Sequence, residues 1–140
     1  MAEKKLDYRL TPSTCAYCGT GCGVLLESMN GRLTGVLPQK DHPVSKGALC
    51  IKGWNCHEFV HSKRRLTRPM IRKGDELVET DWDTAIKVVA EGLGKARDEH
   101  GPDYVGFFAS ARCTNEENYV LMKLARVVIG TNNVDHCARL

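Results

Sequence analysis

The sequence predicts a chain of mixed α+β and α/β character in two parts. A small N-terminal subdomain with a β-hairpin is expected over residues 1–68, and the start of an α/β domain with a parallel sheet over residues 69–140. Three observations predict this fold. Closely spaced cysteines precede an Asn-Gly turn, a long segment with helical periodicity starts near residue 83, and a short apolar run leads through a polar loop into a second helical segment.

The hairpin is expected between Gly23 and Val36, because Asn30-Gly31 is the strongest short-range signal for a tight turn between two strands. Residues 54–62 are typical of a short helix. The basic segment 61–73, which Pro69 interrupts, is expected to be an exposed connector. The boundary between the two parts is expected within residues 66–72.

In the second part, residues 76–82 predict a strand and residues 83–101 an amphipathic helix that ends at Gly101-Pro102. Its apolar positions have helical spacing: Ala85, Ile86, Val89, Ala90, Leu93 and Ala96. Residues 104–110 predict a buried strand, and a helix follows in which Thr114 and Glu117 form a capping box. This order indicates a parallel sheet, where ligands gather beyond the carboxyl ends of strands, so residues 110–118 are a candidate ligand loop. Arg112, beside a helix N-terminus, suits an anion.

Composition excludes several classes of function. No apolar run approaches the ~20 residues that a membrane helix needs, so no membrane span is expected. The charged N-terminal segment lacks the apolar core of a secretory signal, which favours a cytoplasmic location. A formal net charge of +3, without aromatic residues among the basic ones, argues against a nucleic-acid partner.

The chain has seven cysteines, and in a reducing cytoplasm metal or redox chemistry explains them better than disulfides do. Cys15, Cys18 and Cys22 lie in one short loop, and Cys50 follows at a distance. This three-plus-one grouping fits a 4Fe-4S cluster better than the two paired knuckles of structural zinc. Three glycines in the loop favour the same interpretation, because wrapping a cluster requires positive φ angles: Gly19, Gly21 and Gly23.

Two alternatives are open for this metal site. Zinc could replace the cluster, and Cys56 could replace Cys50 as the fourth ligand. Cys56, Cys113 and Cys137 otherwise fit small buried apolar residues. His57 and His61, four residues apart, suit a metal only with a third ligand, and partly exposed helix residues explain them better. Lys52 is either a solvated lysine or a cation beside the cluster.

Five motifs in one order extend this interpretation: C-A-Y-C-G-T-G-C, L-C-I-K-G, R-P-M-I-R, S-A-R-C-T-N-E-E-N-Y and I-G-T-N-N-V-D-H-C-A-R-L. With them the chain resembles the N-terminal part of the catalytic subunit of molybdenum- or tungsten-dependent formate dehydrogenases, within the molybdopterin oxidoreductase family. The resemblance implies that Cys15, Cys18, Cys22 and Cys50 bind a 4Fe-4S cluster. It implies that Lys52 relays electrons between this cluster and a bis-molybdopterin guanine dinucleotide cofactor. The matching cofactor-side loop holds Ser110, Arg112, Asn115 and Asn118.

The same resemblance implies reversible oxidation of formate to CO2, with electrons passing to an iron-sulfur electron-transfer subunit or a hydrogenase- or diaphorase-type partner. Family members are several times longer, so these 140 residues alone are expected to be inactive. In the family, a cysteine or selenocysteine that ligates the metal follows the last motif, so a UGA codon is expected after Leu140. The competing hypothesis is a complete, stand-alone small 4Fe-4S electron carrier.

Overall fold

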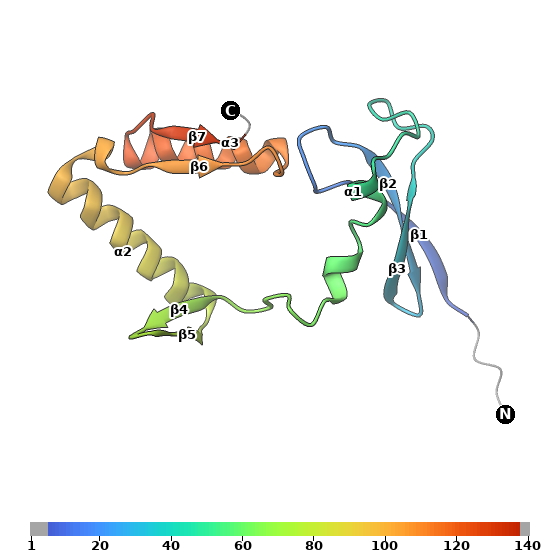
Figure 1. The fold of residues 1–140 in the computed structure, drawn as a ribbon, viewed down its shortest axis with the longest axis horizontal. Coiled ribbons are helices and arrows are strands. Elements are labelled where there is room, and N and C mark those ends of the chain that lie inside the picture. Colours follow the sequence, from blue (N-terminus) through green and yellow to red (C-terminus); the bar gives the residue numbers. More distant parts are fainter. Residues whose placement is uncertain (1–5, 138–140) are drawn as a thin grey trace. The chain divides into compact units, whose positions relative to one another are not determined.

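The computed structural model describes residues 6–137, which form two compact units (Figure 1). The first unit contains residues 6–65 together with residues 111–117, and the second contains residues 66–110 and 118–137. The last three residues of the I-G-T-N-N-V-D-H-C-A-R-L motif lie outside the described part of the chain. Within residues 6–137, no helix combines the length and apolarity that crossing a bilayer demands.

A three-stranded antiparallel sheet forms the base of the first unit. It consists of β1 (Tyr8–Thr14), β2 (Gly23–Met29) and β3 (Arg32–Pro38) in the order β1-β2-β3. The predicted hairpin is confirmed: Asn30 (φ 50°) and Gly31 (φ 77°) form the two-residue turn between β2 and β3. Strand β1 was not expected. All its residues are exposed, and it contains a proline, a residue that argues against a strand in sequence-based prediction.

The unexpected strand explains where the cysteine loop lies. Thr14 at the end of β1 pairs with Gly23 at the start of β2, so residues 15–22 are the connection between two paired strands. The Cys15 backbone N–H donates to the Cys22 carbonyl at 2.8 Å and closes the base of this loop. Beneath it, Cys15, Val24 and Val36 form a small buried core. The sheet therefore holds the cysteine loop from both ends.

The segment after Cys50 contains two short helical pieces, α1 (Ile51–Trp54) and the 3-10 turn η1 (Glu58–His61). The prediction of one helix over residues 54–62 was wrong. The Asn55 side-chain amide donates to the Ile51 carbonyl at 2.8 Å, which satisfies a helix-terminal carbonyl and ends α1 there. This early end leaves Cys56 in the link between the two pieces.

The second unit begins with a hairpin of β4 (Met70–Lys73) and β5 (Glu76–Glu79), joined through Gly74 at φ 63°. The predicted strand at residue 76 is confirmed, but the expectation of a basic connector was wrong for residues 70–73, which form a strand. These residues pair with β5, and their basic side chains are compatible with an exposed two-stranded ribbon. Helix α2 (Trp82–His100) follows and confirms the predicted amphipathic helix to within one residue at each end.

The N-terminus of α2 is capped by Asp81, whose carboxylate accepts from the Thr84 backbone N–H at 2.7 Å. This hydrogen bond lowers the pKa of Asp81 below its ordinary value of 3.8. The cap is therefore complete above that pH and is lost as the pH falls through the lower folded-state pKa. We expect Asp81→Ala to speed amide exchange in the first turn of α2 at neutral pH, measured by hydrogen-exchange mass spectrometry.

The excess exchange rate of the alanine variant over the parent should shrink as the pH falls below 3.8. Asp81→Ser is the matched control, because serine also caps helices but does not titrate in this range. Equal exchange in the alanine variant and the parent at neutral pH would show that Asp81 is not the cap.

The predicted parallel sheet is confirmed by β6 (Phe107–Ala109) and β7 (Val134–His136). Asp103, in the 3-10 turn η2 (Pro102–Tyr104), binds the segment before β7: its carboxylate accepts from buried Thr131 and its carbonyl accepts from Asn133 at 2.8 Å. The expected buried strand is only partly buried, because Phe108 is 88% exposed. Asp103 thus fixes the start of β7 relative to β6.

Helix α3 (Asn115–Lys123) continues into a wider π-type segment, η3 (Leu124–Ile129). The predicted capping box is confirmed, since Thr114 N–H donates to the Glu117 carboxylate at 2.7 Å and Glu117 N–H donates to the Thr114 hydroxyl at 3.3 Å. An apolar groove of about 450 Å³ lies along α2 and η3, and Ile86 and Val89 on its wall are more than half exposed. The apolar face of α2 is therefore not covered by the described residues of the second unit.

Candidate iron-sulfur site

All four predicted cluster ligands line one cavity of about 350 Å³ in the first unit. Three come from the loop between β1 and β2, and Cys50 immediately precedes α1. The rest of the wall is mixed in character: Tyr17, Gly21, Leu49, Ile51, Lys52, Ala111 and Arg112. The structure thus brings together the cysteines that the sequence separates into a group of three and a single residue.

The cavity fits a multinuclear cluster better than one metal ion. A zinc ion with ~2.3 Å bonds would draw the sulfur atoms of its ligands close together around one point. Among the described residues, no group of three histidine, cysteine or acidic side chains meets in that way. A space of about 350 Å³ holds on the order of ten water volumes, far more than a single ion fills. The four cysteines line a cavity whose volume suits a cluster of several ions better than a single ion.

The three glycines of the loop have different roles. Only Gly21 has a positive φ, at 67°, as expected for a turn that most residues avoid. Gly19 and Gly23 are required by close contacts instead: a Cβ on Gly19 would meet the Asn115 side chain, and a Cβ on Gly23 would meet the His42 ring. The prediction of positive φ at all three glycines was therefore wrong for two of them.

Two of the cysteines have environments that favour the thiolate, the form that binds metal. Contact with the Thr20 hydroxyl, 3.4 Å from the Cys18 sulfur, lowers the pKa of Cys18, helped by the Thr20 backbone N–H and the charge of Lys52. Backbone N–H groups of Gly53 and Lys52 lower the pKa of Cys50. These contacts therefore favour the thiolate form of both cysteines.

Cys22 has the opposite tendency. Burial raises the pKa of Cys22, followed by the negative charges of the other three cysteines. Four thiolates in one cavity repel each other, and this cost disappears only when cations lie between them. The electrostatics of the site therefore match a group that brings positive iron ions into the cavity.

Lys52 lies at this cavity, with its ammonium group 5.2 Å from the centre of the Tyr17 ring. A cation over an aromatic face is held by the ring's quadrupole. Its charge also contributes to the lowered pKa values of Cys18 and Cys50. Of the two interpretations of this lysine, the cation beside the cysteines agrees with the structure. Tyr17 was missed, because a tyrosine between two cysteines gives no sign in the sequence of what its ring contacts.

Asn115 connects the cysteine loop to a distant part of the chain. Its side-chain amide donates to the Gly19 carbonyl at 2.8 Å, across a separation of 96 residues. Ala111 and Arg112 from the same distant segment line the cavity, so residues 111–117 complete the wall of the cysteine site. Arg112, predicted to bind an anion beside a helix N-terminus, is thus placed on the cavity of the four thiols.

This connection gives a prediction for stability. Gly19→Ala would bring a Cβ to 2.5 Å from the Asn115 amide oxygen, and we expect destabilisation of about 1–3 kcal/mol, typical of overpacking. Asn115→Ala removes the hydrogen bond and should cost about 1 kcal/mol. Urea unfolding of the full-length subunit, followed by the visible absorption of its cluster, measures both.

The double variant tests whether residues 19 and 115 are in direct contact or whether each substitution disturbs the loop independently. Because Asn115→Ala also removes the atom that Gly19→Ala meets, the double variant should lose less stability than the sum of the two single variants. Gly92→Ala in α2, where an added Cβ meets nothing within 4 Å, is the control and should not be destabilised. Strict additivity of Gly19→Ala and Asn115→Ala would contradict the contact.

The remaining two residues of the predicted cofactor-side loop lie in the second unit. The Asn118 amide donates to the Ser110 carbonyl at 3.1 Å, which joins the end of β6 to α3. The Ser110 hydroxyl also lies 3.8 Å from the Cys137 sulfur. Ser110 and Asn118 therefore hold the loop after β6, where the sequence predicted ligands to gather.

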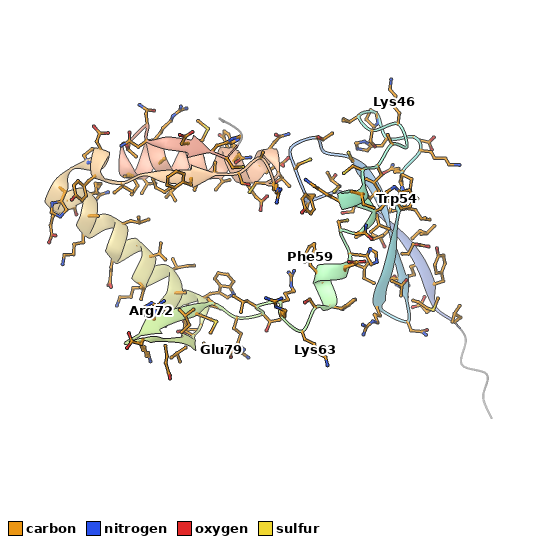
Figure 2. The ribbon with its side chains drawn as sticks, in the orientation of Figure 1. Lys46, Trp54, Phe59, Lys63, Arg72 and Glu79 are labelled. Carbon is orange, nitrogen blue, oxygen red and sulfur yellow. The ribbon has the colours of Figure 1, made fainter. Side chains whose placement is uncertain are left out.

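The other cysteines and the histidine pair do not line the cluster cavity. Cys56 and Cys113 are half-buried and Cys137 is exposed, so the expectation of buried apolar cysteines holds only in part. Burial raises the pKa of Cys56, followed by the charge of Cys15 and a hydrogen bond with its thiol. His57 precedes η1 and His61 is its last residue, and no third ligand meets them among the described residues. Figure 2 labels Trp54 and Phe59, which mark this segment after Cys50.

Comparison with known proteins supports this organisation. Residues 8–62 match the molybdopterin oxidoreductase Fe4S4 domain, and residues 65–140 match the molybdopterin oxidoreductase domain. The matches show a 4Fe-4S cluster and a molybdopterin cofactor as the prosthetic groups, which confirms the predicted cofactors. They also favour the cluster over zinc.

Individual relatives of the chain are formate dehydrogenase alpha subunits. The chain is 59% identical over 126 residues to the F420-dependent formate dehydrogenase 1 subunit alpha of Methanococcus maripaludis. It is 50% identical over 135 residues to the F420-dependent formate dehydrogenase subunit alpha of Methanocaldococcus jannaschii. These matches cover 90% and 96% of this chain, but only 18% and 19% of the relatives.

A solved structure confirms the fold. Acetylene hydratase from Pelobacter acetylenicus aligns with a TM-score of 0.72 and 22% identity, over 89% of this chain and 18% of that chain. At this identity the likeness concerns the fold alone. Together with the domain matches, the cysteine cavity and the parallel strands place the sequence in one family: the chain belongs to the molybdopterin oxidoreductases.

Proposed function

We propose that the chain is the N-terminal part of a formate dehydrogenase catalytic subunit, which oxidises formate reversibly to CO2. The identity of 59% to a formate dehydrogenase alpha subunit carries this proposal, because it extends over 126 residues and both parts of the chain. The relatives are about five times as long as their matched region. The uncovered apolar face of α2 supports the same interpretation and argues against a stand-alone electron carrier.

In this proposal, Cys15, Cys18, Cys22 and Cys50 ligate the 4Fe-4S cluster in a subdomain of residues 1–68. Their common cavity and the thiolate-favouring contacts of Cys18 and Cys50 support the assignment. Residues 69–140 begin the molybdopterin domain. The candidate cofactor-side residues, Ser110, Arg112, Asn115 and Asn118, lie at the end of β6 and the start of α3.

The molybdopterin cofactor supplies two-electron chemistry at formate, and the cluster accepts electrons one at a time. Lys52 keeps a positive charge at the cluster cavity, where Tyr17 restrains it, and acts as an electron relay. Gly19 and Asn115 hold the cysteine loop against residues 111–117. The chain's own residues thus bind, position and electrostatically tune the redox groups.

The finer features of the proposal concern the whole subunit. They are molybdenum or tungsten in a bis-molybdopterin guanine dinucleotide cofactor, a cysteine or selenocysteine as protein ligand to that metal, and an iron-sulfur partner subunit. Because the similar formate dehydrogenase alpha subunits are F420-dependent, an electron pathway that ends on F420 is favoured over a hydrogenase-type partner. Seven free cysteines fit a reducing cytoplasm.

The test uses the full-length subunit, purified anaerobically with its partner. We expect formate to reduce a viologen dye and F420, with release of CO2. A cluster-containing subunit that reduces neither acceptor with formate would contradict the proposed activity. A gene that encodes no further molybdopterin domain would revive the carrier hypothesis.

A further inference from the structure

The first unit has a second cavity, of about 210 Å³, beside the cluster cavity. Tyr17 lines both cavities, so the two share a wall. The rest of the second cavity is largely apolar and includes Leu26, Leu33, Phe59 and Val60. Its volume has room for one large apolar side chain of another protein. A side chain seated there would be separated from the cluster cavity by the shared wall.

The rim of the second cavity has the composition of a protein interface. Phe59 is 50% exposed and Val60 is 39% exposed, although both are apolar. The guanidinium carbon of Arg65 lies 5.1 Å from the centre of the Phe59 ring, an arrangement that restrains both side chains. Aromatic and arginine side chains around an apolar pocket are enriched where proteins bind each other.

The charge beside Phe59 indicates the kind of partner. Arg65 and its neighbour in sequence, Arg64, are exposed, and no carboxylate of residues 6–137 forms an ion pair with either of them. Lys63 extends away from Phe59 in Figure 2. Positive charge at the edge of an apolar pocket favours a docking face that carries carboxylates around an apolar side chain.

We propose that the second cavity, with Phe59 and Arg65 at its rim, docks the electron-accepting partner subunit. An apolar side chain of that subunit enters the cavity, and its carboxylates pair with Arg65. The inference rests on the proposed function, in which electrons leave the cluster for a partner. In each transfer the reduced cluster loses one electron and the redox centre of the partner gains it. Because electron transfer slows steeply with distance, the acceptor must dock close to the cluster, and the shared wall gives this surface that position.

The first experiment measures binding of the full-length, cluster-containing subunit to its purified iron-sulfur partner subunit by calorimetry without oxygen. Arg65→Glu should weaken binding by roughly tenfold or more, because it reverses a charge at the centre of the surface. Arg65→Lys keeps the charge and should lie closer to the parent. Phe59→Ser should weaken binding more than Phe59→Leu does, since leucine keeps an apolar rim. The difference between Arg65→Glu and the parent should shrink at high salt.

The matched control is Arg32→Glu, which makes the same charge change on β3 of the same unit. Arg32 is exposed, and its side chain points to the opposite face of the sheet from Leu33, which lines the cavity. This variant should bind the partner subunit as tightly as the parent does. Iron content equal to that of the parent shows that each variant has folded around its cluster.

A second measurement needs no variant. Hydrogen-exchange mass spectrometry of the parent should show slower amide exchange across residues 58–65 in the complex than in the free subunit. Backbone hydrogen bonds of this segment are local ones in turns, such as the Ser62 N–H donating to the Phe59 carbonyl at 3.2 Å, and they open easily when the surface is free. No change in exchange on binding would overturn the inference.

The outcomes distinguish this inference from the proposed function. Parent-like affinity in both Arg65→Glu and Phe59→Ser would overturn the docking role and leave the enzyme assignment intact. Full protection of residues 58–65 in the free subunit would also overturn it, because the rest of the same subunit would then cover the surface. Protection that rises with the concentration of the free subunit would assign the surface to a second copy instead. A parent subunit that does not reduce a viologen dye with formate would contradict the proposed function itself.

Discussion

Replacing Cys50 with alanine in the full-length subunit should abolish the 4Fe-4S cluster, so that iron falls from about four atoms per chain to a small fraction of that value. Cys50 is the single ligand that comes from outside the loop of residues 15–22. Only three thiols then remain for four irons, and the iron without a protein ligand is open to solvent, which leads to loss of the whole cluster. Iron analysis and visible absorption of anaerobically purified protein measure the effect.

The control for Cys50 is its neighbour in sequence, Cys56, which was the alternative fourth ligand. Because Cys56 does not line the cavity, Cys56→Ala should retain about four irons. If Cys50→Ala kept the cubane and Cys56→Ala lost it, Cys56 would be the fourth ligand. This result would contradict the arrangement described above.

Loss of the Lys52 charge should slow electron transfer without removing a cofactor. We expect Lys52→Ala to lower formate-dependent dye reduction by roughly tenfold or more, the usual size of effects from residues that support a metal site. Iron and molybdopterin contents should stay near those of the parent, since Lys52 is not a ligand. Lys52→Arg keeps the positive charge and should have a smaller effect.

Two comparisons sharpen the Lys52 test. Lys63→Ala removes an exposed lysine of the same unit, labelled in Figure 2, and should have little effect. Tyr17→Phe should retain activity, because a phenylalanine ring also attracts a cation, whereas Tyr17→Leu should resemble Lys52→Ala in part. If Lys52→Ala reduced dye as fast as the parent, the relay role would be wrong.

Local signals in the sequence were sufficient for the elements with strong patterns. The Asn30-Gly31 turn, the apolar spacing of α2 and the Thr114–Glu117 capping box each depend on residues close together in the chain. Strand β1 could not be predicted, because it is exposed along its length and is specified by its pairing with β2. Strand β4 was not predicted either, because its basic residues suggested a connector and its pairing with β5 defines it.

In the candidate site, too, the local sequence predicted some features and not others. Cysteine spacing predicted the four residues that the structure gathers around one cavity, because metal ligands must come from a few residue types. The hydrogen bond between Asn115 and Gly19, and the packing of Cys56 against the core that contains Cys15, join segments far apart in sequence. Nothing in either local sequence specifies its partner, so only the folded chain reveals these contacts.

The most direct test of the central claim is metal and sulfide analysis, combined with Mössbauer spectroscopy, of the full-length subunit purified without oxygen. We predict about four irons and four sulfides per chain, with the spectrum of a 4Fe-4S cluster that is lost on substitution of Cys15, Cys18, Cys22 or Cys50. One zinc ion per chain, with neither sulfide nor visible absorption, would contradict it.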